Sequence, residues 1–174
     1  MVQLEQRNSG QLSATRLPTL KRKFTDLINL FAVANYKNHT VVLSGGQTQR
    51  EEVDLYNLKQ KKWTKGPCLN YHRFYHSSCC LGKHAYVFGG EYSRGAIESF
   101  QVEGGKVWHI LSESNQLVGR WHLAVAILND HSIAIYGGRS PGKFSNKGIV
   151  FDTQSKTCMR ILGGENDLKF QCFS

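Results

Sequence analysis

The sequence predicts an all-β protein built from repeated units of four short antiparallel strands. Three observations predict this fold class. A short apolar strand ending in a glycine pair occurs three times, an aromatic residue follows each pair, and a tryptophan follows the aromatic residue in two copies. Self-similarity at a period of a few tens of residues is typical of repeat architectures. The pairs are spaced 44 and 48 residues apart, and comprise Gly45 and Gly46, Gly89 and Gly90, and Gly137 and Gly138.

The two ends of the chain fall outside these units. Residues 1–23 are polar and mixed, so we expect a polar segment or the remnant of a degenerate further unit. This segment has no apolar run behind a basic start, so it does not resemble a signal peptide. Residues 165–174 resemble the start of an incomplete further unit, with a strand at 170–173.

The first unit covers residues 24–68. Its apolar segment 31–35 predicts the first strand, and 40–44 predicts the strand that leads to the glycine pair. Tyr56 marks the third strand, and Trp63, seven residues later, marks the fourth. The segment between them is rich in Asn, Lys and Gln and predicts a hairpin turn.

The second and third units, residues 69–117 and 118–164, repeat this order. Segments 77–81 and 123–128 predict their first strands, each followed by a tight turn and a glycine strand. Phe100 and Trp108 mark the later strands of the second unit. In the third unit Phe151 is followed by Cys158, where the pattern would place a tryptophan.

This order of glycine pair, aromatic residue and tryptophan resembles the kelch repeat. The resemblance covers about residues 24–164. In the second and third copies it extends to an arginine and a histidine before the first strand, in 73–76 and 120–122. The first copy has Ile28 and Leu30 near those positions, so its start is the most degenerate.

The resemblance implies that each unit is one blade of a β-propeller. Glycines near the axis of such a ring allow close backbone approach, and large aromatic side chains fill the wider gaps farther out. We therefore expect structural roles for eleven residues: Gly45, Gly46, Tyr56, Trp63, Gly89, Gly90, Phe100, Trp108, Gly137, Gly138 and Phe151.

Three blades do not close a ring, because propellers have about four to eight and kelch propellers most often six. An open arc would expose apolar faces of the kind that mark interfaces. We expect that two chains pair as three plus three blades in a six-bladed homodimer, or that another protein caps the arc.

Kelch propellers bind partner proteins on the face where their loops gather, which implies a non-catalytic interaction scaffold. Arginines on that face can hold acidic side chains through paired hydrogen bonds. The matching positions are Arg73, Arg120 and Arg139, with Glu91 following the second glycine pair. Arg73 and Arg120 can also be interpreted as structural residues that brace the blade by hydrogen bonding to neighbouring loops. The partner itself cannot be named from these residues.

The formal net charge of +9 favours a partner with an acidic surface. The basic residues are scattered along the chain except at 21–23 and 59–62. Because both clusters are expected in turns or at segment edges, the charge distribution argues against a nucleic-acid partner. No segment is long and apolar enough to span a membrane. Five cysteines, an odd number without a regular framework, favour reduced thiols and a cytoplasmic protein.

The sequence lacks common catalytic motifs such as Gly-x-Ser-x-Gly and His-Glu-x-x-His. An enzyme is therefore not the favoured interpretation, and no cofactor is expected. Potential metal ligands gather at Cys68, His72, His76, Cys79 and Cys80, with His84 beyond, but Cys79 and Cys80 fall in one strand and face opposite sides. Buried cysteines acting as small apolar residues explain this pair better. The alternative function is a metal-dependent kelch-like propeller enzyme, of which galactose oxidase is the copper-dependent example.

Overall fold

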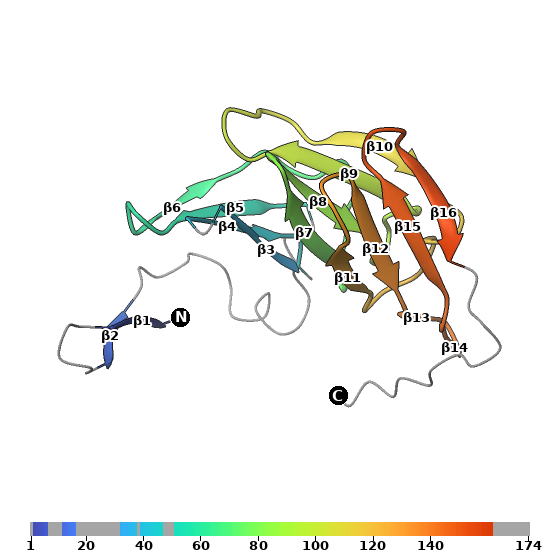
Figure 1. Ribbon diagram of the computed structural model, residues 1–174, viewed down its shortest axis with the longest axis horizontal. Helices are drawn as coiled ribbons and strands as arrows, with labels where there is room; N and C mark the ends of the chain where they lie inside the picture. Colours follow the sequence, from blue (N-terminus) through green and yellow to red (C-terminus); the bar gives the residue numbers. More distant parts are fainter. Residues whose placement is uncertain (1, 7–11, 17–31, 38, 47–50, 162–174) are drawn as a thin grey trace.

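A computed structural model describes residues 2–6, 12–16, 32–37, 39–46 and 51–161, and this part of the chain contains strands and turns but no α-helix. The all-β prediction is confirmed. Three four-stranded sheets form the main body, and β1 (Val2–Gln6) and β2 (Leu12–Arg16) form a separate antiparallel pair (Figure 1). Most of the polar segment predicted at 1–23 lies outside the described residues, and the strand predicted at 170–173 lies wholly outside them.

The first sheet contains β3 (Ala32–Tyr36), β4 (Thr40–Ser44), β5 (Val53–Asn57) and β6 (Lys62–Lys65), paired in that order. Every pairing is antiparallel, so the chain folds as a simple meander. The basic residues at 59–62 occupy the turn from β5 into β6, as expected. The other basic cluster, 21–23, lies outside the described residues.

The second sheet repeats the meander with β7 (Ser77–Leu81), β8 (His84–Phe88), β9 (Ala96–Gln101) and β10 (His109–Glu113). The third contains β11 (Ala124–Ile127), β12 (Ser132–Tyr136), β15 (Gly148–Asp152) and β16 (Thr157–Ile161). Between β12 and β15 the chain forms a small hairpin of β13 (Arg139–Ser140) and β14 (Lys143–Phe144). Each sheet therefore comes from one copy of the repeat.

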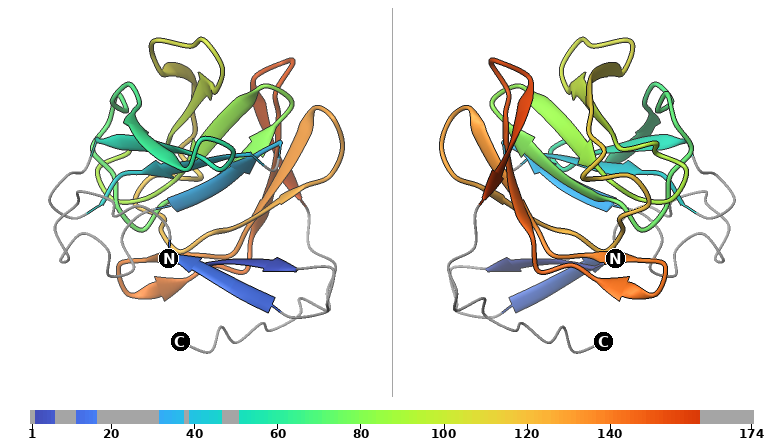
Figure 2. Two further views of the ribbon diagram at one scale, coloured as in Figure 1. Left: turned by 90° about the vertical axis from the view of Figure 1, so that its left-hand side faces the viewer. Right: turned by 90° about the vertical axis from the view of Figure 1, so that its right-hand side faces the viewer.

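The sheets stack on one another through two apolar cores. Strand β7 packs against β3 on one side and β11 on the other, so the second sheet lies between the first and the third (Figure 2). Val42, Val87 and Phe100 belong to the first core, and Phe88 and Ile135 belong to the second. Because successive side chains of a strand face opposite sides, each strand that ends in a glycine pair contributes side chains to both faces of its sheet.

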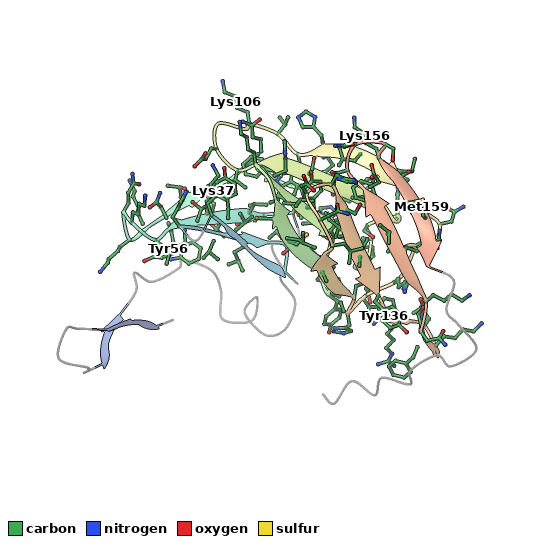
Figure 3. The ribbon with its side chains drawn as sticks, in the orientation of Figure 1. Lys37, Tyr56, Lys106, Tyr136, Lys156 and Met159 are labelled. Atoms are coloured by element: carbon green, nitrogen blue, oxygen red, sulfur yellow. The ribbon has the colours of Figure 1, made fainter. Side chains whose placement is uncertain are left out.

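The connections divide between two ends of the sheets. At the hairpin end lie the tight turns from first to second and from third to fourth strand of each sheet. At the loop end lie the longer segments 66–76, 89–95, 114–123 and 137–147. Figure 3 places Lys106 and Lys156 at one end of the molecule and Tyr136, which precedes the third glycine pair, toward the other. The loop end is where Arg139 and Glu91 lie.

Candidate functional site

The glycine pairs hold the loop end together because they admit backbone contacts between neighbouring sheets. A Cβ atom on Gly45 would lie 2.5 Å from the carbonyl oxygen of Arg73, and one on Gly89 would lie 2.4 Å from the carbonyl oxygen of Arg120. Both glycines have φ near +60 to +70°, a region that side chains disfavour. Gly137 has φ of +68° but no such crowding. In the third pair the crowding falls on Gly138 instead, where a Cβ atom would lie 2.8 Å from the carbonyl oxygen of Trp121, so close packing requires a glycine in each pair.

Backbone hydrogen bonds connect the loops in series from one sheet to the next. The Gly90 amide donates to the Arg120 carbonyl over 2.9 Å, and the His122 amide donates to the Tyr75 carbonyl over 3.0 Å. Trp121 and Arg139 exchange two bonds of 2.9 and 2.7 Å. The first two bonds cross between the second and third units and fix their loops relative to one another, whereas the Trp121–Arg139 bonds hold the small hairpin against the loop before β11 within the third unit.

Arg73 lies beneath the loop surface and has no exposed area. Its guanidinium donates to the Gly89 carbonyl over 3.0 Å, to the Ala96 carbonyl over 3.2 Å and to Glu98 Oε1 over 2.5 Å. Burial lowers the pKa of Arg73, and the neighbouring Glu98 carboxylate opposes that shift. The structure gives Arg73 the bracing role and leaves no part of it for a partner to contact.

Glu98 completes this buried pair, and the sequence patterns did not identify it. Its other oxygen, Oε2, accepts hydrogen bonds from the Asn70 amide over 2.7 Å and from Asn70 Nδ2 over 2.9 Å. A buried ion pair requires such additional bonds to offset the loss of hydration. The network therefore ties the loop before β7 to the third strand of the same sheet.

Arg120 occupies the same place in the third unit with different partners. Its Nε atom donates to the Gly137 carbonyl over 2.7 Å, and its two terminal nitrogens donate to the carbonyls of Gln116 and Lys147. Its relative exposure is 5%, and burial lowers its pKa. Arg120 thus also braces the loops, here through carbonyl oxygens alone.

The predicted aromatic positions lie against one another on their sheets. The ring centroids of Tyr56 and Trp63 are 4.8 Å apart, and those of Phe100 and Trp108 are 5.3 Å apart. Phe151 is fully buried and stands directly opposite Cys158 in the strand register. These residues lie within the sheets, away from the loop surface.

The exposed surface of the loop end carries a cluster of rings that the sequence analysis did not single out. We call Phe74, Tyr75, Tyr92 and His122 the ring cluster. Successive centroids lie 4.5–5.9 Å apart: Tyr92 to Phe74, Phe74 to Tyr75, and Tyr75 to His122. The cluster therefore spans the loops of the second and third units.

Three members of the ring cluster have a left-handed backbone. The φ angles are +56° at Tyr75, +62° at Tyr92 and +55° at His122. Such angles are outliers for bulky residues, cost free energy and occur preferentially at functional sites. Tyr75 and His122 stand two residues after their bracing arginines, so the same backbone conformation recurs in two units.

Arg139 and Phe144 extend the ring cluster onto the small hairpin of the third unit. The Arg139 guanidinium lies 5.5 Å from the centroid of the Phe144 ring, and 85% of Phe144 is exposed. A cation over an aromatic face is weakly attractive at exposed sites. Glu91 lies beside the ring cluster, since its backbone amide donates a hydrogen bond to the Phe74 carbonyl over 3.1 Å. Of the four predicted contact residues, Arg139 and Glu91 therefore lie at the surface beside the rings.

The surroundings of His122 disfavour its protonated form. Desolvation lowers its pKa, and the positive charge of Arg139 lowers it further. A neutral imidazole can both donate and accept a hydrogen bond. The cluster therefore presents aromatic rings and an imidazole beside the permanent positive charge of Arg139.

The candidate metal ligands do not converge. Cys79 packs with the second core and Cys80 with the first, on opposite faces of β7 as the alternation predicts. Burial raises the pKa of both thiols to about 12. His76 is 5% exposed, with Nε2 2.9 Å from Ser44 Oγ. Within the described ranges, no group of three or more His, Cys, Asp or Glu side chains is placed to hold a metal ion.

Comparison with known proteins gives no family assignment. No family model matches the chain, and no curated protein matches it at the significance threshold applied. A search of the described residues for a helix long and apolar enough to cross a membrane found none.

Proposed function

We propose that this chain is a kelch-type β-propeller arc of three blades that acts as a non-catalytic protein-binding scaffold in the cytoplasm. The loop end is its binding surface. The observation that carries the proposal is the ring cluster together with Arg139 and Phe144, on loops that the buried Arg73 and Arg120 brace through hydrogen bonds. The kelch resemblance supports the same end of the fold for binding, since kelch propellers bind partners where their loops gather.

The physical properties of this surface fit a protein partner. Exposed aromatic side chains and arginine are the residues most enriched at the energetic centres of protein interfaces. Rings held by strained backbone and inter-loop hydrogen bonds lose little conformational freedom on binding, which favours affinity. Phe144, at 85% exposure, is the most prominent apolar anchor.

The charge of the surface favours an acidic segment in the partner. Arg139 provides a planar group suited to a carboxylate, and Lys143 and Lys147 flank it on the same hairpin connection. The hairpin end differs, because its turns carry exposed lysines such as Lys61, Lys83 and Lys106, and the ring contact described in these turns is the pair Tyr36 and His39. Specific contacts are thus proposed for the loop end.

Affinity capture with matched variants tests this proposal. The double variant Arg139→Glu and Phe144→Ala removes the cation and the anchor while leaving both cores intact. The matched control is Lys106→Glu and Val107→Ala at the hairpin end, where Val107 is 54% exposed. We expect mass spectrometry to show at least tenfold less of the captured partners with the first variant and unchanged recovery with the control.

Two results would contradict the loop-end assignment. Either every captured protein is retained by the Arg139→Glu and Phe144→Ala variant, or the control at the hairpin end loses the same partners. Circular dichroism of both variants establishes that the sheets remain folded.

A further inference from the structure

The third sheet has an apolar face that none of the described sheets covers. We call it the open face: the side of β11, β12, β15 and β16 turned away from the second sheet. The strand register assigns ten residues to it: Ala124, Ala126, Ser132, Ala134, Tyr136, Gly148, Val150, Asp152, Thr157 and Met159. All of them except Ser132 and Gly148 are exposed or partly exposed in the single chain.

The outer face of the first sheet, in contrast, is already covered within one chain. Leu43, Asp54 and Tyr56 lie on the side of that sheet turned away from the second, and their exposed fractions are 4%, 3% and 0%. Val42 points to the opposite side and belongs to the first core. The open face is therefore the outer sheet face that a second molecule can reach.

The open face has no positive charge, although the chain is basic. None of the 22 lysines and arginines is among its ten residues, and Arg160 stands opposite Ile149 on the other face of the sheet. Asp152 lies at the hairpin end of the open face, where Ser155 and the Gln154 amide donate to it. Because two chains with a formal net charge of +9 repel each other, a face without basic side chains is where they approach at the lowest electrostatic cost.

One row of side chains crosses the open face from small to large. The register places Ala126, Ala134, Val150 and Met159 side by side on the four strands. The two ends of this row are exposed, and Met159 has an exposed fraction of 59%. Close packing over such a row requires a surface graded in the opposite direction, with large side chains over the alanines and small ones over Met159.

We propose that a second copy of this chain covers the open face with its own open face. The twofold axis runs parallel to the strands, midway between the two sheets, and places β11 over β16 and β12 over β15 of the second copy. Ala126 then lies over Met159, and Ala134 over Val150, so each small side chain meets a large one. Packed sheets lie about 10 Å apart, a gap that such pairs fill. An axis perpendicular to the strands would instead set Ala126 over Ala126 and Met159 over Met159.

Sedimentation equilibrium of the full chain at micromolar concentration tests the dimer. We expect a species with twice the mass of one chain. Ala126→Lys places a charge at an exposed position of the open face and should give a folded monomer. Ile127→Lys is the matched control, because Ile127 is the next residue of β11, is 49% exposed and faces the other side. It should leave the dimer intact.

A monomeric wild-type chain overturns the proposal whether or not the variants fold. So does a dimer that Ala126→Lys leaves unchanged. A monomeric chain that captures a different protein through Ala126 would also overturn it, by naming another occupant of the open face.

The dimer is independent of the proposed partner binding at the loop end. The Arg139→Glu and Phe144→Ala variant should remain a dimer, and monomeric Ala126→Lys should still capture the loop-end partners. Failure of one proposal is therefore distinguishable from failure of the other.

Crosslinking with a short bis-maleimide tests which residues face each other. In a Cys68→Ser and Cys172→Ser background, Ala126→Cys and Met159→Cys each place one exposed thiol on the open face. The cysteines that remain are partly buried, and burial raises the pKa of their thiols, so they react slowly: Cys79, Cys80 and Cys158. The proposed axis predicts linked dimers from a mixture of the two variants and from neither variant alone.

Two crosslinking results would overturn the proposed arrangement. Linkage within each variant alone, without further linkage in the mixture, would show that identical residues face each other. A dimer that gives no linkage in the mixture would show that the two open faces do not meet.

Discussion

Two arginines occupy equivalent positions before the first strands of the second and third sheets, and their partners differ. Arg73 pairs with the buried Glu98 carboxylate, whereas Arg120 donates to carbonyl oxygens alone. The register explains the difference, since the position of Glu98 in β9, two residues before Phe100, is taken by Ile149 in β15. The second unit therefore depends on an ion pair that the third replaces with neutral acceptors.

Removal of Glu98 should destabilise the protein strongly. Glu98→Ala leaves the Arg73 guanidinium buried without its counter-charge, and both side chains have no exposed area. Breaking a buried pair in this way costs about 3–5 kcal/mol. Urea unfolding measures the loss in the free energy of unfolding. Ile149→Ala, its equivalent in the third sheet, is the apolar control at a position that lacks the ion pair.

The double variant Arg73→Met and Glu98→Leu separates charge burial from packing. Replacing both partners with apolar groups of similar volume is often neutral. We therefore expect it to recover most of the stability lost in Glu98→Ala. If Glu98→Ala unfolds at the same urea concentration as the wild type, the bracing role of the pair is contradicted.

The pH response of His122 reports the geometry of the loop surface. Desolvation and Arg139 lower its pKa below the ordinary value of 6.5. Since the folded state disfavours the protonated ring, its contribution to stability is present above pH 6.5 and is lost as the pH falls through the lower folded pKa. Proton NMR titration should show this depressed pKa, and Arg139→Gln should raise it.

An unchanged pKa of His122 in Arg139→Gln would mean that the two side chains do not face each other in solution. Tyr75→Ala serves as a second probe, because its ring lies 4.5 Å from the imidazole and covers it. Removal of the Tyr75 ring should also raise the pKa of His122, because water regains access to the imidazole.

At the scale of the strand, the two tryptophans lie in different environments. Trp108 stacks on Phe100, donates its indole N–H to the Pro67 carbonyl over 3.0 Å and is 4% exposed. Trp63 lies on a strand whose other residues are exposed and is only partly buried. The equivalent residues thus contribute differently to the stability of one chain.

Alanine substitution should separate the two environments. Trp108→Ala should cost about 3–5 kcal/mol, as for other buried large side chains. Trp63→Ala should cost less in the isolated chain, because less of its surface leaves water on folding. Chemical denaturation of both variants measures the difference. Equal costs would contradict the placement of Trp63 on an outward face.

The sequence predicts the strands far better than the loop surface, for physical reasons. The glycine pairs and following aromatic residues recur in the same order at similar spacing, since every sheet meets the same packing demands. Glu98 is hidden because it stands in the third strand, 25 residues after Arg73, with no recurring signal. The left-handed backbone at Tyr75 and His122 has no sequence signal either, because positive φ is uncommon for any residue other than glycine.

For the whole molecule, the two ends of the sheets differ in chemistry. Turns at the hairpin end carry exposed lysines, among them Lys37, Lys106 and Lys156, which Figure 3 labels. The loop end carries the ring cluster, Arg139 and Phe144. Lysine is depleted and aromatic residues and arginine are enriched in protein interfaces. This asymmetry is why the proposed partner contact is placed at the loop end.

Site-directed photo-crosslinking tests that placement most directly. A benzophenone amino acid replaces Phe144 at the loop end in one protein and Val107 at the hairpin end in another. The proposed function predicts a crosslinked partner from position 144, with competition by excess unlabelled chain, and none from position 107. A partner that crosslinks from position 107 but not from position 144 would contradict the central claim.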